Sequence, residues 1–225
     1  MERDAVVGRS LRTPRAAAIA GILFALLLTA ALVLVRVGAP PDSGDTGAWL
    51  TDPSSRRLVA LALHLVPFAG IAFLWFIGVV RDRIGQREDR FFATVFLGSG
   101  LLFVGMLFVA TAVAAGLLAG PGDRTGAPDE IWGHRIVVIV MNTYAMRMAA
   151  VFTIATATIG LRTGFMPRWI GLSGYAIAVV LLVAIGITPW VKLLFPLWIL
   201  VLSLDTLVES LGRRRAEWDL PSSAE

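Results

Sequence analysis

Six long apolar runs constrain this chain more than any other feature of its sequence. Each is about as long as the ~20 residues that an α-helix needs to cross a hydrocarbon core of about 30 Å. The runs lie at residues 16–37, 58–80, 91–119, 136–161, 168–187 and 190–211. The sequence therefore predicts an all-α fold, a polytopic transmembrane bundle of six helices.

The composition leaves room for a single membrane domain. Hydrophobic residues make up 57% of the chain and charged residues 16%, against the ~25% charged expected of a soluble domain. The connections between the runs are too short to hold a second folded unit. We predict a cytoplasmic N-terminal segment at 1–15, a six-span transmembrane domain at 16–211, and a cytoplasmic tail without fixed structure at 212–225.

The positions of arginine predict the orientation of the bundle. If the N-terminus is cytoplasmic, the inner segments hold most of the arginines, in the ranges 3–15, 81–90, 162–168 and 213–215. The outer flanks hold fewer basic residues, among them the single lysine of the chain, Lys192. The positive-inside rule then favours both termini in the cytoplasm, which an even number of spans requires. With no organelle address or lipidation motif, we expect a multi-pass protein of a bacterial plasma membrane.

The composition also excludes several kinds of chemistry. The chain has no cysteine and only two histidines, so thiolate metal sites, iron–sulfur clusters and histidine metal sets cannot form. The sequence carries no catalytic, nucleotide or metal motif. We therefore expect no cofactor and favour a role that is not enzymatic.

The expected partners follow from the same composition. A pI near 10.6 is ordinary where arginines flank membrane spans, so nucleic acid is not an expected partner. The lipid bilayer surrounds the spans, and the cytoplasmic arginine clusters are suited to contact anionic head groups. The oligomeric state is not set by the sequence.

Charged residues within the fourth and sixth runs carry the sharpest structural hypothesis. Arg147 lies near the middle of the fourth run and Asp205 well inside the sixth. A central arginine costs ~2.5 to 3.5 kcal/mol on insertion scales, so it needs a partner. Counting residues from the presumed outer edge puts the two at similar depths, which predicts an ion pair. Glu209 follows Asp205 by four residues and shares its helix face.

Further polar residues lie in the second and fourth runs. His64 and Asn142 are at about the same distance from the outer edge, which permits a hydrogen bond between them. Tyr144 shares a polar stripe of the fourth run with Arg147. Together these residues form the predicted intramembrane polar cluster: His64, Asn142, Tyr144, Arg147, Asp205 and Glu209.

Three functions are compatible with such a cluster. The first is transport or permeation of a small solute, ion or proton through a polar interior around the second, fourth and sixth spans, because membrane carboxylates often mark such paths. The second is a non-enzymatic scaffold or assembly factor, in which Arg147 and Asp205 only pair helices. The third is a lipid-modifying enzyme that uses Asp205, Glu209 and His64, for which the sequence has no nucleophile or metal motif.

One short stretch carries a resemblance. Residues Arg81 to Gly100, which include Glu88-Asp89-Arg90-Phe91-Phe92, resemble segments of uncharacterised small multi-span membrane proteins of actinobacteria. The resemblance brings with it no activity and no residue role.

Overall fold

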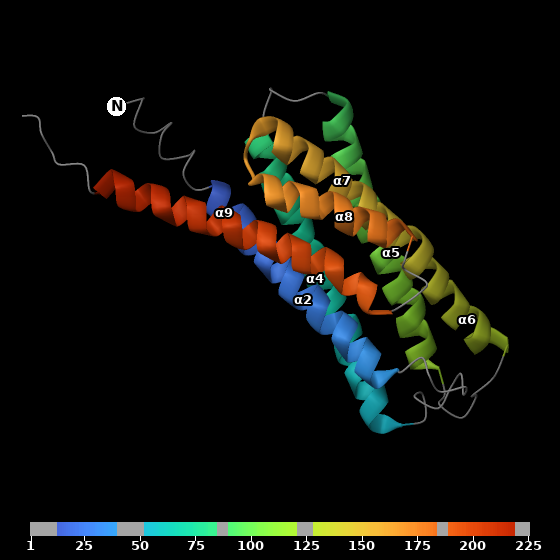
Figure 1. Ribbon diagram of the computed structural model, residues 1–225. Coiled ribbons are helices and arrows are strands. Elements are labelled where there is room, and N and C mark those ends of the chain that lie inside the picture. The colour runs from blue at the N-terminus through green and yellow to red at the C-terminus, as the bar shows by residue number, and fades with distance from the viewer. Residues whose placement is uncertain (1–12, 40–51, 85–89, 121–127, 184–188, 219–225) are drawn as a thin grey trace, which may run out of the picture.

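The fold is built from helices. The computed structural model describes residues 13–39, 52–84, 90–120, 128–183 and 189–218, and every regular element in these ranges is helical (Figure 1). The elements in chain order are α2 (Thr13–Gly38), α4 (Pro53–Ile84), α5 (Arg90–Ala119), α6 (Pro128–Ile139), the π-helical segment η2 (Val140–Ala145), α7 (Met146–Thr163), α8 (Arg168–Val183), the 3₁₀ turn η3 (Pro189–Leu193) and α9 (Leu194–Trp218). The predicted all-α class is confirmed for these residues.

Five of the helices are long and apolar enough to cross a membrane. They cover Arg15–Gly38, Pro53–Arg81, Phe91–Ala119, Ile131–Thr163 and Trp190–Leu211. The fifth apolar run, predicted at 168–187, forms the shorter helix α8 of 16 residues, and its residues 184–187 lie outside the described ranges. Within the described ranges the structure thus has the helices of an integral membrane protein, five of them of spanning length, and the remaining predicted span is represented there by the shorter apolar helix α8.

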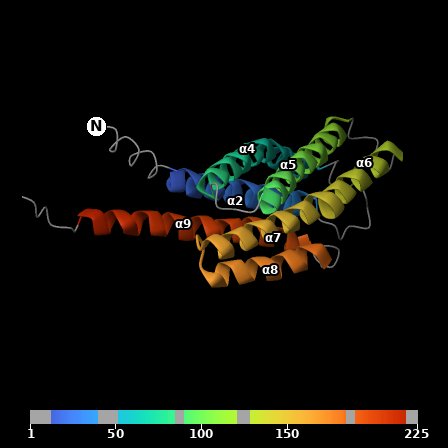
Figure 2. The same cartoon turned by 90° about the horizontal axis from the view of Figure 1, so that it is seen from above.

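The helices pack side by side and alternate in direction. The α2 helix packs against α4 and α9, while α7 packs against α5 and α8. Figure 2 shows α8 on the outside of α7, with α9 beside α2 and α6 continuing the line of α7. The segments α6, η2 and α7 therefore form one rod, in which the backbone passes through a π-helical stretch.

A layer of phenylalanines forms the centre of the bundle. Phe24, Phe73, Phe103, Phe152 and Phe195 come from five different helices, and each is 0% exposed. Their ring centroids lie 4.4 Å apart for Phe24 and Phe73, and 5.0 Å apart for both Phe73 with Phe152 and Phe103 with Phe195. Such edge-to-face and tilted contacts add to the burial of the rings themselves. We call these five residues the Phe layer.

Local sequence signals explain two of the helix ends. Asp52 precedes α4, and its carboxylate accepts the backbone N–H of Ser55 at 2.9 Å, which is the geometry of an N-cap with proline as the first helical residue. The α7 helix ends at Gly164, whose φ of 70° lies in the left-handed region that glycine adopts at low cost. The chain then turns tightly into α8.

The C-terminal end differs from expectation. The α9 helix continues to Trp218, inside the range 212–225 that composition assigned to a tail without fixed structure. The helical hydrogen-bond pattern extends past the apolar run that defined the predicted boundary, because a helix does not need apolar residues to continue. Residues 219–225 lie outside the described ranges.

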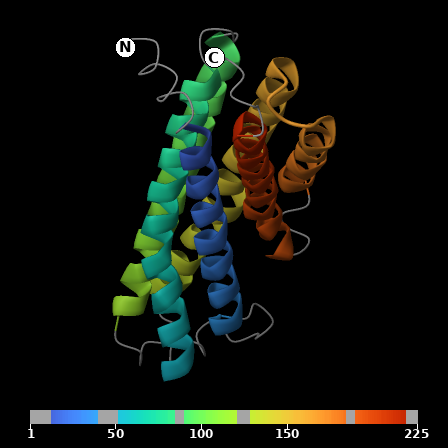
Figure 3. The same cartoon turned by 90° about the vertical axis from the view of Figure 1, so that its left-hand side faces the viewer.

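The helices do not all reach the same level at one end of the bundle. Figure 1 shows that α8 and α9 stop well short of the ends of α4 and α6, and Figure 3 shows the same relative to α4. At this end of the bundle, the half that holds the ends of α4 and α6 therefore contains fewer helices than the half on the opposite side of the Phe layer.

Candidate functional site

Arginines place the Phe layer relative to a membrane. Arg15, Arg81 and Arg162 each lie eight to ten residues to one side of the layer residue of their own helix. At 1.5 Å per residue this is about 12–15 Å, which is close to half of a hydrocarbon core of about 30 Å. If these arginines mark one edge of a hydrocarbon core, the Phe layer lies near its middle. We call the arginine end of the bundle the inner end and the opposite end the outer end.

Arg147 and Asp205 lie on opposite sides of this layer. Arg147 is five residues towards the outer end from Phe152, and Asp205 is ten residues towards the inner end from Phe195. Fifteen residues of helix separate their levels by about 22 Å, and no ion pair joins them in the part of the chain that the structure describes. The predicted pair is not formed, because α9 begins close to the Phe layer and its apolar run therefore starts deep in the bundle.

The other members of the predicted cluster are also dispersed. His64 is exposed on α4, and its Nδ1 lies 2.6 Å from the carbonyl oxygen of Ala60. Among the described residues, the buried side-chain oxygen of Asn142 has no hydrogen-bond partner, so the hydrogen bond to His64 that equal depth permits is not formed. Tyr144 is 53% exposed, and Glu209 is half-buried on α9 beyond Asp205. These side chains do not line a common interior space.

A different site lies in the outer half of the bundle. The short reach of α8 and α9 leaves a partly open cavity of about 210 Å³ between α2, α4, α5, α6 and η3. Its wall is mostly apolar and includes Leu28, Leu107 and Met141. Its polar lining residues are Thr111, His134 and Lys192. We call this space the outer cavity.

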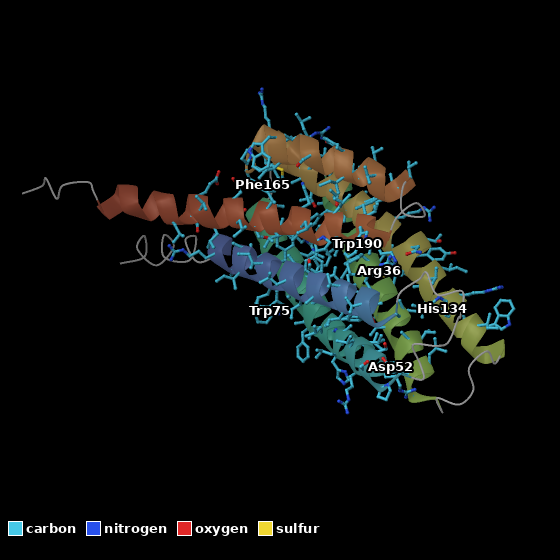
Figure 4. The ribbon with its side chains drawn as sticks, turned by 60° about the horizontal axis from the view of Figure 1, so that its bottom comes forward. Arg36, Asp52, Trp75, His134, Phe165 and Trp190 are labelled. Atoms are coloured by element: carbon cyan, nitrogen blue, oxygen red, sulfur yellow. The ribbon has the colours of Figure 1, made fainter. Side chains whose placement is uncertain are left out.

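Lys192 gives the outer cavity its charge. Its side chain is half-buried, and it has no ion pair or hydrogen bond within the described ranges. Arg36 adds to the positive potential at Lys192, and its guanidinium carbon lies 5.9 Å from the centre of the Trp190 ring. Figure 4 shows Arg36 beside Trp190, with His134 on the neighbouring α6. A cation in apolar surroundings is costly unless it is paired, so the cavity is suited to a negatively charged group.

The polar groups of the cavity wall include one hydroxyl, that of Thr111. The hydroxyl of Thr111 donates to the carbonyl of Leu107 at 2.8 Å and is thus satisfied by its own helix. Among the described residues, no three histidine, aspartate or glutamate side chains are grouped closely enough to hold a metal ion.

A second, much smaller cavity lies on the inner side of the Phe layer. It has a volume of about 20 Å³ and is lined in part by Ser203 and Thr206, which is room for about one water molecule. The hydroxyl of Ser203 is buried without a partner. The Phe layer therefore separates an outer space of ligand size from an inner space of water size.

Comparisons with known proteins do not add to this assignment. No family model, curated protein or solved structure matches the chain. The site therefore rests on its geometry and its charge.

Lys192 is the residue that reasoning from the sequence missed. It was placed with the outer flanking cations, where a lysine is ordinary. The signal was its position two residues inside an apolar run, 190–211. Whether Lys192 lies at the surface or in a cavity depends on the depth of η3 and α9 in the bundle. The hydropathy of the run does not predict this depth.

Proposed function

We propose that this protein is a multi-pass membrane protein that binds a small amphiphilic anion in its outer cavity. The observation that carries the proposal is Lys192, a half-buried cation without a partner in the described residues, set in the wall of an otherwise apolar space. A carboxylate or phosphate on Lys192 forms a charge-assisted hydrogen bond. The hydrocarbon part of the same ligand then covers the apolar wall.

The cavity volume sets the size of the ligand. An apolar cavity of about 150 Å³ binds benzene, so a cavity of about 210 Å³ suits a ligand of roughly ten non-hydrogen atoms. Octanoate is an anion of this size. Because the cavity is partly open, somewhat longer chains fit with one end outside it.

The proposal includes a membrane orientation. Both termini are cytoplasmic in a bacterial plasma membrane, with α8 and α9 forming the last pair of membrane segments. This is supported by the alternating direction of the helices and by Arg15, Arg81 and Arg162 at the inner end. Anionic lipid at these inner arginines is part of the same proposal. The outer cavity then faces the outer leaflet.

Binding of octanoate to protein in lipid nanodiscs tests the proposal. We expect octanoate to bind more tightly than 1-octanol, and Lys192→Met to weaken octanoate binding by about 10- to 150-fold, because a hydrogen bond to a charged group contributes about 1.5–3 kcal/mol. Octanol binding changes little, since it depends on the apolar wall. Isothermal titration calorimetry with empty nanodiscs as the blank measures both.

Two further variants serve as controls. Lys192→Arg retains the charge and keeps most of the affinity, whereas Arg57→Gln removes an exposed cation that does not line the cavity and leaves the affinity unchanged. The unfolding midpoint of Lys192→Met shows whether the fold is kept. Equal octanoate affinity in Lys192→Met and the wild type would rule out the proposal.

Transport is the second candidate function, and the two cavities on opposite sides of the Phe layer favour it. A bound anion can cross the bundle only if this layer opens, since its five side chains are fully buried against one another. Uptake of labelled octanoate into proteoliposomes tests this step. Uptake lost in Lys192→Met supports transport, whereas binding without uptake restricts the function to ligand binding. The scaffold hypothesis loses its main argument, because the Arg147 to Asp205 pair is not formed.

A further inference from the structure

Arg147 is an exposed cation in the middle of a helical rod of membrane-spanning length. The rod covers Ile131–Thr163, and Arg147 is exposed on its surface. The outer cavity uses His134, Val137, Val138 and Met141 of the same rod but not Arg147. Arg147 therefore belongs to a different face, and what it binds is independent of the outer cavity.

The backbone directs the guanidinium of Arg147 towards the outer end. Helical side chains lean towards the N-terminus of their helix, which for α7 is the outer side. One guanidinium nitrogen, Nη1, donates to the carbonyl oxygen of Thr143 at 2.8 Å. Thr143 lies in η2, one turn N-terminal to Arg147, so its carbonyl oxygen is within reach of the Arg147 side chain. This hydrogen bond holds the guanidinium about one turn above its own Cα.

The level of the guanidinium matches the edge of the hydrocarbon core. Arg147 is five residues from Phe152, which corresponds to about 7.5 Å, and one turn adds about 5.4 Å. The sum of about 13 Å is close to half of a core of about 30 Å. Tyr144 lies three residues earlier on the same side of the helix and is 53% exposed. Tyrosine is enriched at this level of a membrane.

We infer that Arg147, with Tyr144 beside it, binds the phosphate group of a phospholipid in the leaflet at the outer end. Phosphate oxygens are present at the level that the guanidinium reaches, and a guanidinium fork matches a phosphate with two parallel hydrogen bonds. The hydrogen bond to Thr143 occupies one nitrogen, so donors remain for the lipid. The alternative partner is an acidic residue of another protein's helix at the level of the Arg147 Cα. Binding to such a residue would not require the Arg147 side chain to extend towards the outer end.

Native mass spectrometry of delipidated protein in detergent tests this inference. The probes are phosphatidylglycerol, a diglucosyl diacylglycerol with the same acyl chains but no phosphate, and inorganic phosphate. Beyond any lipid at the inner arginines, we expect the wild type to retain one phosphatidylglycerol that Arg147→Gln retains at least tenfold less well and Tyr144→Phe about threefold less well. Arg57→Gln, which removes an exposed arginine at the outer end of α4, retains it fully.

The remaining arms separate the possible occupants. Retention of the glycolipid equal to that of phosphatidylglycerol, or equal retention in Arg147→Gln and wild type, would overturn the inference. Displacement of the lipid by millimolar inorganic phosphate would assign the site to free phosphate instead. A membrane protein that co-purifies with the wild type but not with Arg147→Gln would assign it to a protein carboxylate. Arg147→Lys keeps the charge without the fork, and we expect an intermediate loss in a variant whose unfolding midpoint is unchanged.

Discussion

The inner and outer halves of the bundle differ most clearly within a single rod. In α7 most side chains are buried, among them Thr153, Ala155, Thr156 and Ile159 on the inner side of Phe152. In α6, the outer part, none of the described side chains from 131 to 139 is buried. The π-helical segment η2 lies between the two parts. One continuous helical rod thus passes from close packing to loose packing within a few residues.

The cause of the difference is the reach of the neighbouring helices. At the inner end α7 has α5 and α8 against it, whereas α6 packs mainly on α5. Within a bilayer, helices associate through van der Waals packing and hydrogen bonds rather than through the hydrophobic effect. Stability is therefore expected to come from the inner half and the Phe layer. The space that α8 and α9 leave open is the outer cavity, where the proposed ligand would complete the packing.

Removal of a ring from the Phe layer should have the largest effect on stability. Phe73 is 0% exposed and contacts the rings of Phe24, Phe103, Phe152 and Phe195. We expect Phe73→Ala to lower the free energy of unfolding by about 3–5 kcal/mol, because a central void is left that neighbouring helices cannot fill. Unfolding in mixed detergent micelles, followed by circular dichroism, measures the change.

Leu63→Ala provides the comparison in the outer half. Leu63 lines the outer cavity and is half-buried, so part of its surface already faces empty space. We expect a loss of about 1 kcal/mol or less for this variant. Similar losses for Phe73→Ala and Leu63→Ala would mean that the two halves are equally packed, and the comparison would fail.

Glycines in the two halves should respond with opposite signs. A Cβ at Gly174 would lie 2.8 Å from the Trp198 ring and 3.2 Å from the Cβ of Ala157, and Trp198 is held by a 3.1 Å hydrogen bond from its ring nitrogen to Ile170. Gly174→Ala should therefore cost about 1–3 kcal/mol by overpacking. At Gly116, in the outer half of α5, a Cβ would meet nothing within 4 Å.

Gly116→Ala is the matched control for this prediction. Because alanine is the better helix former, we expect a gain of about 0.5–1 kcal/mol where there is space for the methyl group. The same unfolding measurement applies to both glycine variants. A stability loss in Gly116→Ala would indicate that a contact closes on the outer half of α5.

The sequence predicts the helices well and their relative depth poorly. Residues 91–119 were expected as one span and form α5 from Arg90 to Ala119, because a bilayer demands a minimum apolar length. The depth of a helix in the bundle is harder to predict than its length. An apolar run indicates how long a helix is but not where it begins relative to its neighbours. Phe195 lies in the central layer only one residue after α9 begins at Leu194, and this displaces Asp205 from the level of Arg147.

The candidate site was hidden by the same limit. Lys192 is ordinary as an outer flanking cation. It becomes unusual only because η3 lies closer to the Phe layer than the outer end of α4 does. The π-helical segment was also beyond prediction, since Val140–Ala145 has no breaker residue. Both features depend on long-range packing between helices, for which the local pattern of a single chain contains no direct signal.

Polar contacts replace packing at the outer end of α4, and Asp52 tests how much they contribute. The hydrogen bond from the Ser54 hydroxyl, followed by the backbone N–H of Ser55, lowers the pKa of Asp52 from 3.8 to about 2. A carboxyl group with a lowered pKa stabilises the folded state above its unfolded pKa, and this contribution is lost as the pH falls from about 4 towards 2. The effect should be the smallest of those considered, because the carboxylate is exposed and solvent screens it.

Asp52→Asn keeps a good N-cap but has no charge to titrate, so its unfolding midpoint should fall less between pH 4 and pH 2 than that of the wild type. Asp52→Ala, which loses the cap as well, should be less stable than both at neutral pH; identical profiles for all three proteins would show that the outer end of α4 contributes nothing to the stability of the bundle.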